Sequence, residues 1–211
     1  QYLTSQDDAI GQQTREGIVY MPNIYESPIY YSTLTLERAA EIFLMFNYSN
    51  PQYYFMDGVY VYIESSNIFV PTFYEEFRSG SARSKATQAM KNTITSWEST
   101  IASAGSTEQK AKAAHDLIAK KVQYDDNYLT NPDNPFHQSA YSVFCDDHSV
   151  CAGYTKAFEM LMNGAGIDTI AVLSTDHAWN MIRINDSWYH MDCTWDDMDG
   201  YSGYEMIYNF F

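Results

Sequence analysis

The chain has 211 residues, of which 45% are hydrophobic and 18% charged, a composition typical of a folded protein. This length is enough for one domain with a full core, or for a small domain with an accessory region. The net charge of −15 repels phosphate backbones and argues against nucleic-acid binding, and no apolar run approaches the roughly 20 residues of a membrane span.

The first third of the chain shows the pattern of a helix followed by a strand hairpin. Apolar residues at helical spacing predict a helix over residues 36–46, with Thr35 as its N-cap. β-branched and aromatic residues then alternate over residues 53–74, around turn residues at 57–58 and 65–67. This alternation predicts a hairpin.

Two further helices and a long loop precede the C-terminal part. The first helix is predicted over residues 81–102, and the second over residues 107–122, with Thr107 as its N-cap. The loop over residues 124–139 contains two prolines and several aspartate and asparagine residues. A loop of this length often carries function.

The C-terminal part reads as one helix followed by three short strands. Residues 151–163 have a helical pattern that closes at the sequence NGAG. Strand-like alternation follows in DTIAVLS, AWNMIRI and SWYHMDC, and Asn185 and Asp186 form the turn between the last two. This order predicts an α+β fold in which a helix packs on an antiparallel sheet.

Three residues with complementary chemistry fall at the ends of these elements. Cys151 lies at the predicted helix start, where backbone N–H groups and the helix dipole lower the pKa of a thiol from about 8.5. His177 opens the second strand and Asp192 ends the third. Because a hairpin pairs the first residue of one strand with the last of the next, we expect His177 and Asp192 side by side, facing Cys151.

This arrangement suits acyl transfer by a cysteine nucleophile. The thiolate attacks an amide carbonyl, the imidazole protonates the leaving amine, and the carboxylate orients the imidazole. The backbone N–H of Cys151 is a candidate oxyanion donor, with Tyr141 and His148 as candidates for the second donor. Trp179 and Trp195 flank the expected cleft, either as a wall for an aliphatic acyl chain or as core side chains.

Each of these residues also has a simpler interpretation. Taken alone, a cysteine such as Cys151 is most often a small buried side chain, and a histidine such as His177 is most often structural. Asp192 can be a strand-end cap, and Asp196 and Asp197 are its nearest competitors for the orienting role.

Metal and disulfide alternatives involve the same region. Cys145, His148 and Cys151 have a spacing that zinc tolerates, but no second closely spaced pair follows, so the sequence predicts no metal and no cofactor. A disulfide between Cys145 and Cys193 stays open. The acidic residues 146–147 do not match the calcium-loop pattern and fit a solvated face better.

Two blocks of the chain resemble the core of the transglutaminase-like superfamily: VCAGYTKAFEMLMNGAGI and HAWNMIRINDSWYHMDCTWDD. Members carry a cysteine at a helix start, a histidine that opens HAWN, and an aspartate before TWDD. HDLIAKKVQYDDNY, residues 115–128, is similar to the helix and loop before the cysteine in bacterial members. The resemblance covers roughly residues 107–197 and implies a papain-like α+β core with Cys151, His177 and Asp192 as its triad.

Two features depart from the family pattern. FCDDHSV precedes the cysteine where we expect a small glycine-containing turn, and the chain ends soon after TWDD. We expect residues 1–103 to form an accessory region of helix, hairpin and helix, and residues 104–211 to form the catalytic core. Because the chain begins at Gln1 and ends abruptly in MIYNFF, we expect it to be part of a longer protein.

The resemblance implies a cysteine hydrolase or acyltransferase that acts on peptide or protein amides, with a thioester intermediate and with hydrolysis favoured. A cross-linking transglutaminase is the first alternative, because the same triad serves both reactions. A catalytically inactive surface-binding module is the second. The acidic, aromatic-rich composition and the missing start favour an extracellular or cell-surface location, with cell-wall material or surface glycoprotein as a candidate partner.

Overall fold

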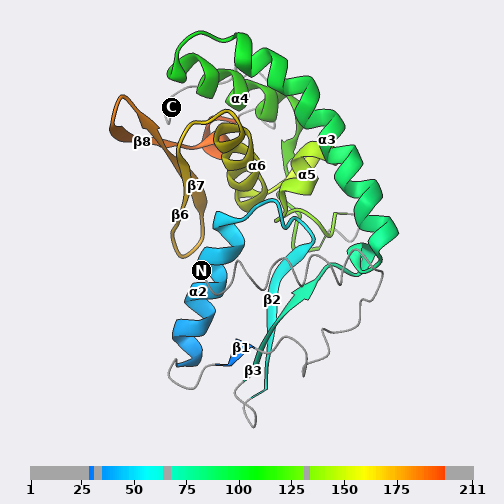
Figure 1. Ribbon diagram of the computed structural model, residues 1–211. Coiled ribbons are helices and arrows are strands. Elements are labelled where there is room, and N and C mark those ends of the chain that lie inside the picture. Colours follow the sequence, from blue (N-terminus) through cyan, green and yellow to red (C-terminus); the bar gives the residue numbers. More distant parts are fainter. Residues whose placement is uncertain (1–28, 31–34, 64–67, 131–133, 198–211) are drawn as a thin grey trace. The chain divides into compact units, whose positions relative to one another are not determined.

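The computed structural model has helices and strands in mixed order, which places it in the α+β class predicted from the sequence. Among the described residues, no helix combines the length and apolarity needed to cross a membrane. The structure describes residues 29–30, 35–63, 68–130 and 134–197 (Figure 1).

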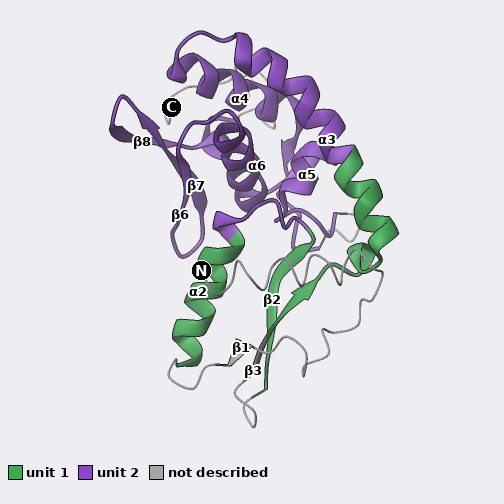
Figure 2. Cartoon of the chain, viewed as in Figure 1, with its two compact units in different colours: residues 1–47, 55–88 green, residues 48–54, 89–211 purple. Residues whose placement is uncertain are grey.

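The chain divides into two units (Figure 2). The first unit consists of residues 1–47 and 55–88, and the second of residues 48–54 and 89–211. The boundary predicted between the accessory region and the catalytic core, after residue 103, stays a prediction.

The first unit has a three-stranded antiparallel sheet. Its hairpin is confirmed, although the turn predicted at residues 65–67 lies outside the described residues. Asp57 and Gly58 lie inside a strand, where the register shifts and Gly58 has a φ of 78°. The carboxylate of Asp57 stabilises this bulge by accepting hydrogen bonds from the Val59 N–H (2.9 Å) and the Thr72 hydroxyl (2.6 Å). In the order β1-β3-β2, the strands are β1 (Ile29–Tyr30), β3 (Ile68–Phe73) and β2 (Met56–Ile63).

The helices before residue 104 follow the predicted pattern closely. The Thr35 hydroxyl accepts the Arg38 N–H at 3.2 Å, as expected of the predicted N-cap, and this helix continues to Ser49 rather than ending at Phe46. The helix predicted over residues 81–102 is also confirmed. The helices are α2 (Leu36–Ser49), the short 3-10 helix η2 (Glu75–Phe77) and α3 (Gly80–Ser103).

The second unit has one central helix, α6 (Cys151–Gly164). It packs on the antiparallel sheet β6-β7-β8, so the predicted helix and three strands are confirmed (Figure 1). Helices α4, α5 and α7 contact it as well. The other elements are α4 (Thr107–Lys121), β4 (Gln123–Tyr124), α5 (Ala140–Cys145), β5 (His148–Ser149), β6 (Thr169–Leu173), β7 (Ala178–Ile184), β8 (Ser187–Met191) and α7 (Cys193–Asp196).

Helix α4 starts at a capping box that corrects one sequence prediction. Ser106 is the N-cap: its hydroxyl accepts the Gln109 N–H at 3.3 Å, and the Gln109 side chain accepts the Ser106 N–H at 2.9 Å. The prediction of Thr107 as N-cap was therefore wrong. The glutamine three residues after Ser106 completes the reciprocal pair that fixes the helix start.

The core of the second unit surrounds α6. Tyr154, Phe158 and Met162 recur every four residues, so they lie along one side of the helix, and all three are fully buried. Ile118 from α4 and Phe144 from α5 are equally buried. This packing gives the first residue of α6, where the predicted nucleophile lies, a rigid support.

Two ionisable side chains are buried on α6, Lys156 and Glu159. Burial lowers the pKa of Lys156 to about 8 and raises the pKa of Glu159 to about 8. The ammonium of Lys156 donates to the Gln138 carbonyl at 3.1 Å and lies 4.6 Å from the centre of the Tyr48 ring. Burial therefore favours the protonated acid form of Glu159.

Glu159→Gln is expected to flatten the pH dependence of stability between pH 5 and 8. The folded-state pKa of Glu159 lies above its ordinary 4.5, so its contribution to stability is lost as pH rises towards about 8. Urea unfolding should show that, from pH 5 to pH 8, the free energy of unfolding of the wild type falls by at least about 1 kcal/mol more than that of the variant. Glu98→Gln, at an exposed position of α3, is the control, and parallel curves for wild type and Glu159→Gln would contradict the assignment.

Candidate active site

Cys151 is the first residue of α6 and is half-buried. Val150 has extended backbone angles and is the N-cap, so the chain turns into the helix at the cysteine. The N–H groups of the first helical turn have no carbonyl partner within the helix. Hydrogen bonds from the backbone of Ala178, Ala152 and Cys151 itself lower the pKa of the Cys151 thiol.

These hydrogen bonds do not determine the net change in the pKa of the Cys151 thiol. Burial is the largest influence and raises the pKa of the Cys151 thiol above its ordinary value, and the negative charge of Asp192 raises it further. The lowering expected from the helix start alone is therefore outweighed. A Cys151 thiolate at neutral pH requires a nearby cation.

His177 and Asp192 are directly hydrogen-bonded, with 2.6 Å between Nε2 and Oδ2. His177 precedes β7 and Asp192 follows β8, and the strands pair in the predicted antiparallel register. The other oxygen of Asp192 accepts the Thr194 N–H (3.0 Å) and the Trp195 N–H (3.2 Å), which makes this carboxylate the N-cap of α7. The sheet end therefore holds a carboxylate in a fixed position against the imidazole.

Trp179 and Trp195 both stack against the His177 ring. The ring centres of His177 and Trp195 are 4.6 Å apart with an interplanar angle of 8°, and those of His177 and Trp179 are 5.7 Å apart with an angle of 18°. The side chain of His177 is only 12% exposed, whereas Trp195 is 53% exposed. The indoles thus contact the imidazole itself, and their predicted role as a wall for an acyl chain stays a prediction.

The two candidates for the second oxyanion donor have other contacts. The ring of Tyr141, on α5, stacks on Tyr54 with centres 5.9 Å apart, and its hydroxyl is hydrogen-bonded to Cys145. The ring of His148 is hydrogen-bonded to Asp147 at 2.8 Å. Their role as oxyanion donors stays a prediction.

Two tyrosines that the sequence did not single out lie within electrostatic range of Cys151. Burial and the charge of a Cys151 thiolate raise the pKa of Tyr48 and of Tyr124 to about 12. Tyr124 belongs to β4, which pairs in parallel with β5 just before the cysteine, with Ser149 as its partner. Among 19 tyrosines, no local pattern distinguished these two, since only the tertiary fold brings them near the sulfur.

The acidic pair of the TWDD segment supports the fold around the site. Asp196 and His115 are both fully buried, with 3.5 Å between Oδ2 and Nε2. Asp197 accepts the Tyr154 hydroxyl at 2.5 Å. These contacts join α7 to α4 and α6. The carboxylate bonded to His177 is that of Asp192, the residue favoured for the orienting role from the strand pattern.

The three cysteines are relevant to two alternatives raised by the sequence, a disulfide and a zinc site. Cys145, Cys151 and Cys193 all have free thiols, so the disulfide between Cys145 and Cys193 is not formed. Within the described part of the chain, no three histidine, cysteine, aspartate or glutamate side chains are grouped as a metal site requires. Burial raises the pKa of the Cys145 thiol to about 11, which disfavours its thiolate at neutral pH.

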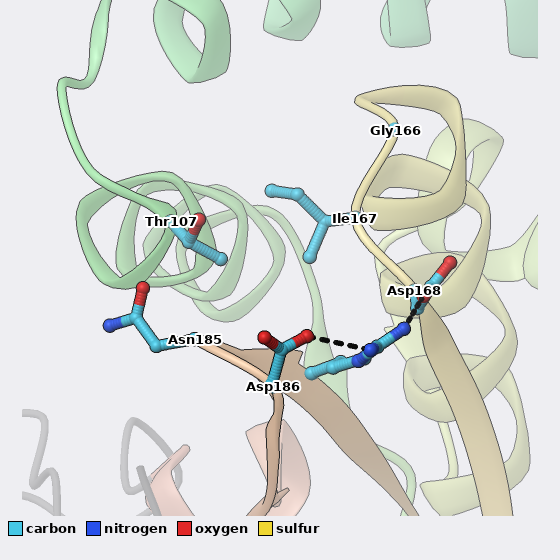
Figure 3. Close-up of a pocket in the computed structure, with 7 residues that line it drawn as sticks. Thr107, Gly166, Ile167, Asp168, Asn185 and Asp186 are labelled. Carbon is cyan, nitrogen blue, oxygen red and sulfur yellow. Dashed lines mark hydrogen bonds and ion pairs between the residues drawn. The ribbon is translucent and has the colours of Figure 1, made fainter.

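A pocket of about 280 Å³ lies at the turn end of the β7–β8 hairpin (Figure 3). His177 and Asp192 lie at the other end of the hairpin. Within it, the Arg183 guanidinium pairs with Asp168 at 3.2 Å and with Asp186 at 2.7 Å. No predicted site residue lines this pocket. It is lined by Thr107, Gly166, Ile167, Asp168, Arg183, Asn185 and Asp186.

Part of the chain matches a known family model. Residues 95–193 match the family model described as the transglutaminase-like superfamily. No curated protein matches the chain. A solved structure of a TGase is 15% identical, with a TM-score of 0.46, and the match covers 61% of this chain and 35% of that one. A candidate protease from Parabacteroides distasonis is 14% identical, with a TM-score of 0.35 and coverages of 61% and 28%. The chain thus spans about a third of the length of these structures.

Proposed function

Because residues 95–193 of this chain match the model of the transglutaminase-like superfamily, we propose that it catalyses cysteine-dependent acyl transfer on peptide or protein amides. The superfamily includes acyltransferases and proteases that use a cysteine. In this proposal Cys151 is the nucleophile, His177 the general acid and base, and Asp192 the residue that orients His177. The 2.6 Å hydrogen bond between His177 and Asp192 carries the proposal.

The hydrogen bond to Asp192 gives the two nitrogens of the His177 ring different roles. Nε2 is bonded to Asp192, so Nδ1 is the atom that exchanges a proton with Cys151. The Cys151 proton moves to Nδ1, and the resulting imidazolium supplies the cation that the buried thiolate needs. Asp192 stabilises this imidazolium without taking its proton.

Acyl transfer then proceeds in two steps. The thiolate adds to the amide carbonyl, Nδ1–H of His177 protonates the departing nitrogen, and a thioester with Cys151 remains. The N–H of Cys151 is the first candidate donor to the oxyanion. In the second step His177 removes a proton from water or from an amine, which attacks the thioester and restores the free thiol.

Hydrolysis is the release step that we favour. Trp195, which stacks on His177, is 53% exposed, so this side of the site is open to water. An enzyme that transfers the acyl group to an amine must exclude water from the thioester. The exposed indole supports a peptidase or amidase, and cross-linking remains the alternative.

The proposal is tested by trapping the thioester. The chain is incubated with a library of short peptides that contain glutamine and asparagine, with and without a fluorescent primary amine, and quenched in acid. Mass spectrometry is expected to show an acyl adduct on Cys151 and cleaved or deamidated peptides, all absent in Cys151→Ser. Cys145→Ser is the matched control and should behave as the wild type. Amine-labelled peptides would indicate cross-linking, and the absence of both adduct and product would favour a non-catalytic binding module.

A further inference from the structure

Trp179 is held by a second histidine on the face of the sheet that points away from α6. Its indole Nε1–H donates to Nδ1 of His190 across 2.8 Å. His190 pairs with Met181 in the β7–β8 ladder, so it lies diagonally opposite Trp179 on the same face. The alternate residues of β7, Ala178 and Asn180, are buried on the other face.

The hydrogen bond between Trp179 and His190 is linked, through the Trp179 indole, to the ring of His177, the proposed catalytic histidine. The indole of Trp179 stacks on His177 at 5.7 Å and 18°, and packs against the ring of His190 at 6.1 Å and 39°. Trp179 thus links His190 to His177. Since its Nδ1 accepts a hydrogen bond, the ring proton of His190 lies on Nε2 in this arrangement.

The orientation of the His177 ring needs more than one contact. Asp192 fixes Nε2 and Trp195 also stacks on the ring, but a tilt of the ring about the hydrogen bond still moves Nδ1 relative to the Cys151 sulfur. A stacked indole limits this tilt only if the indole itself is held in place. The bond from Trp179 to His190 supplies that restraint.

We propose that His190 is a positioning residue, which holds the Trp179 indole against His177 and so favours the thiolate–imidazolium pair. The inference rests on the proposed function of Cys151 and His177. It assigns a role to a residue outside the triad, on the neighbouring strand and exposed to solvent.

The test measures alkylation of Cys151 by iodoacetamide at pH 7.5 and pH 10, resolved by peptide mass spectrometry. At pH 10 the Cys151 thiolate forms with little help from His177, so the rate there depends mainly on the access of iodoacetamide to the sulfur. The rate at the lower pH divided by the rate at pH 10 therefore reports the ion pair, corrected for this access. His190→Leu removes the acceptor, His190→Asn keeps an oxygen near the position of Nδ1, and Trp179→Phe keeps a ring without the N–H. Trp188→Leu changes an exposed side chain of the same strand and is the matched control.

His190→Leu and Trp179→Phe are each expected to lower the rate ratio about fivefold, the effect of one hydrogen bond. The double variant should lower it no further, because both changes remove the same bond. His190→Asn should restore most of the ratio, and Trp188→Leu should leave it unchanged.

Four results would overturn the inference. If the wild type reacts at pH 7.5 through an ion pair but His190→Leu reacts equally well, the positioning role fails and the proposed function stands. If the losses in His190→Leu and Trp179→Phe add up in the double variant, or if the loss follows the melting temperature without rescue in His190→Asn, the effect is structural. If Cys151 of the wild type itself shows no reaction at pH 7.5, the proposed function fails as well.

Discussion

Replacing His177 by alanine is expected to lower the alkylation rate of Cys151 at pH 5 by about 50-fold. Burial and the charge of Asp192 both raise the pKa of the Cys151 thiol, so without an imidazolium almost no thiolate forms in acid. A thiolate held in an ion pair is a weaker nucleophile than one with an ordinary pKa, which offsets part of the gain in thiolate fraction.

The same substitution should reduce thioester formation by about 1,000-fold, because His177 must also protonate the departing nitrogen. Alkylation is followed from pH 4 to 10 and should change from a profile with an acid plateau to a single rise above pH 9. Cys145 is the internal control: burial raises the pKa of its thiol to about 11, and its profile should be identical in both proteins. An acid plateau that survives in His177→Ala would exclude the ion pair with His177.

Gly153→Ala is expected to destabilise the protein by about 3 kcal/mol and to disrupt the start of α6. A β-carbon at this position would overlap the Ser149 hydroxyl and would lie 2.8 Å from the His137 carbonyl oxygen and 3.0 Å from the Ser139 carbonyl oxygen. The serine hydroxyl can rotate, but the two carbonyls belong to the backbone and cannot move away cheaply. Relief of the clash therefore shifts the helix start, and Cys151 with it.

Gly164→Ala is the matched control on the same helix. Nothing lies within 4 Å of a β-carbon at Gly164, the last residue of α6, so this change should be neutral or stabilise by a few tenths of a kcal/mol. Urea unfolding compares the two variants with the wild type, and alkylation at pH 5 reports the helix start. Equal stabilities of Gly153→Ala and Gly164→Ala would contradict the close packing at Gly153.

Local pattern was sufficient to predict the elements that carry the candidate site. The apolar spacing and the NGAG stop placed the helix that begins at Cys151, and alternation placed the three strands after it. The turn at Asn185 and Asp186, both with positive φ, fixed the register. That register predicted the neighbouring positions of His177 and Asp192, now joined by a hydrogen bond.

Other features depend on contacts between segments far apart in sequence. The net effect of burial on the Cys151 thiol could not be read from a helix start, since it depends on what covers the sulfur. Tyr48 and Tyr124 approach Cys151 from segments that share no pattern with it. The stacking of Trp195 on His177 depends on α7, a helix of only four residues, which is too short to show a helical pattern in the sequence.

The order of α6 and the β7–β8 hairpin along the chain affects how the candidate site forms during folding. The helix that carries Cys151 and the hairpin that carries His177 and Asp192 follow one another without interruption, so only short loops must close to bring them together. Closing short loops loses little chain entropy, and contacts local in sequence form fast. During synthesis these residues emerge after α4 and α5, the helices that α6 contacts. The interval between the synthesis of Cys151 and that of His177 and Asp192 is therefore short.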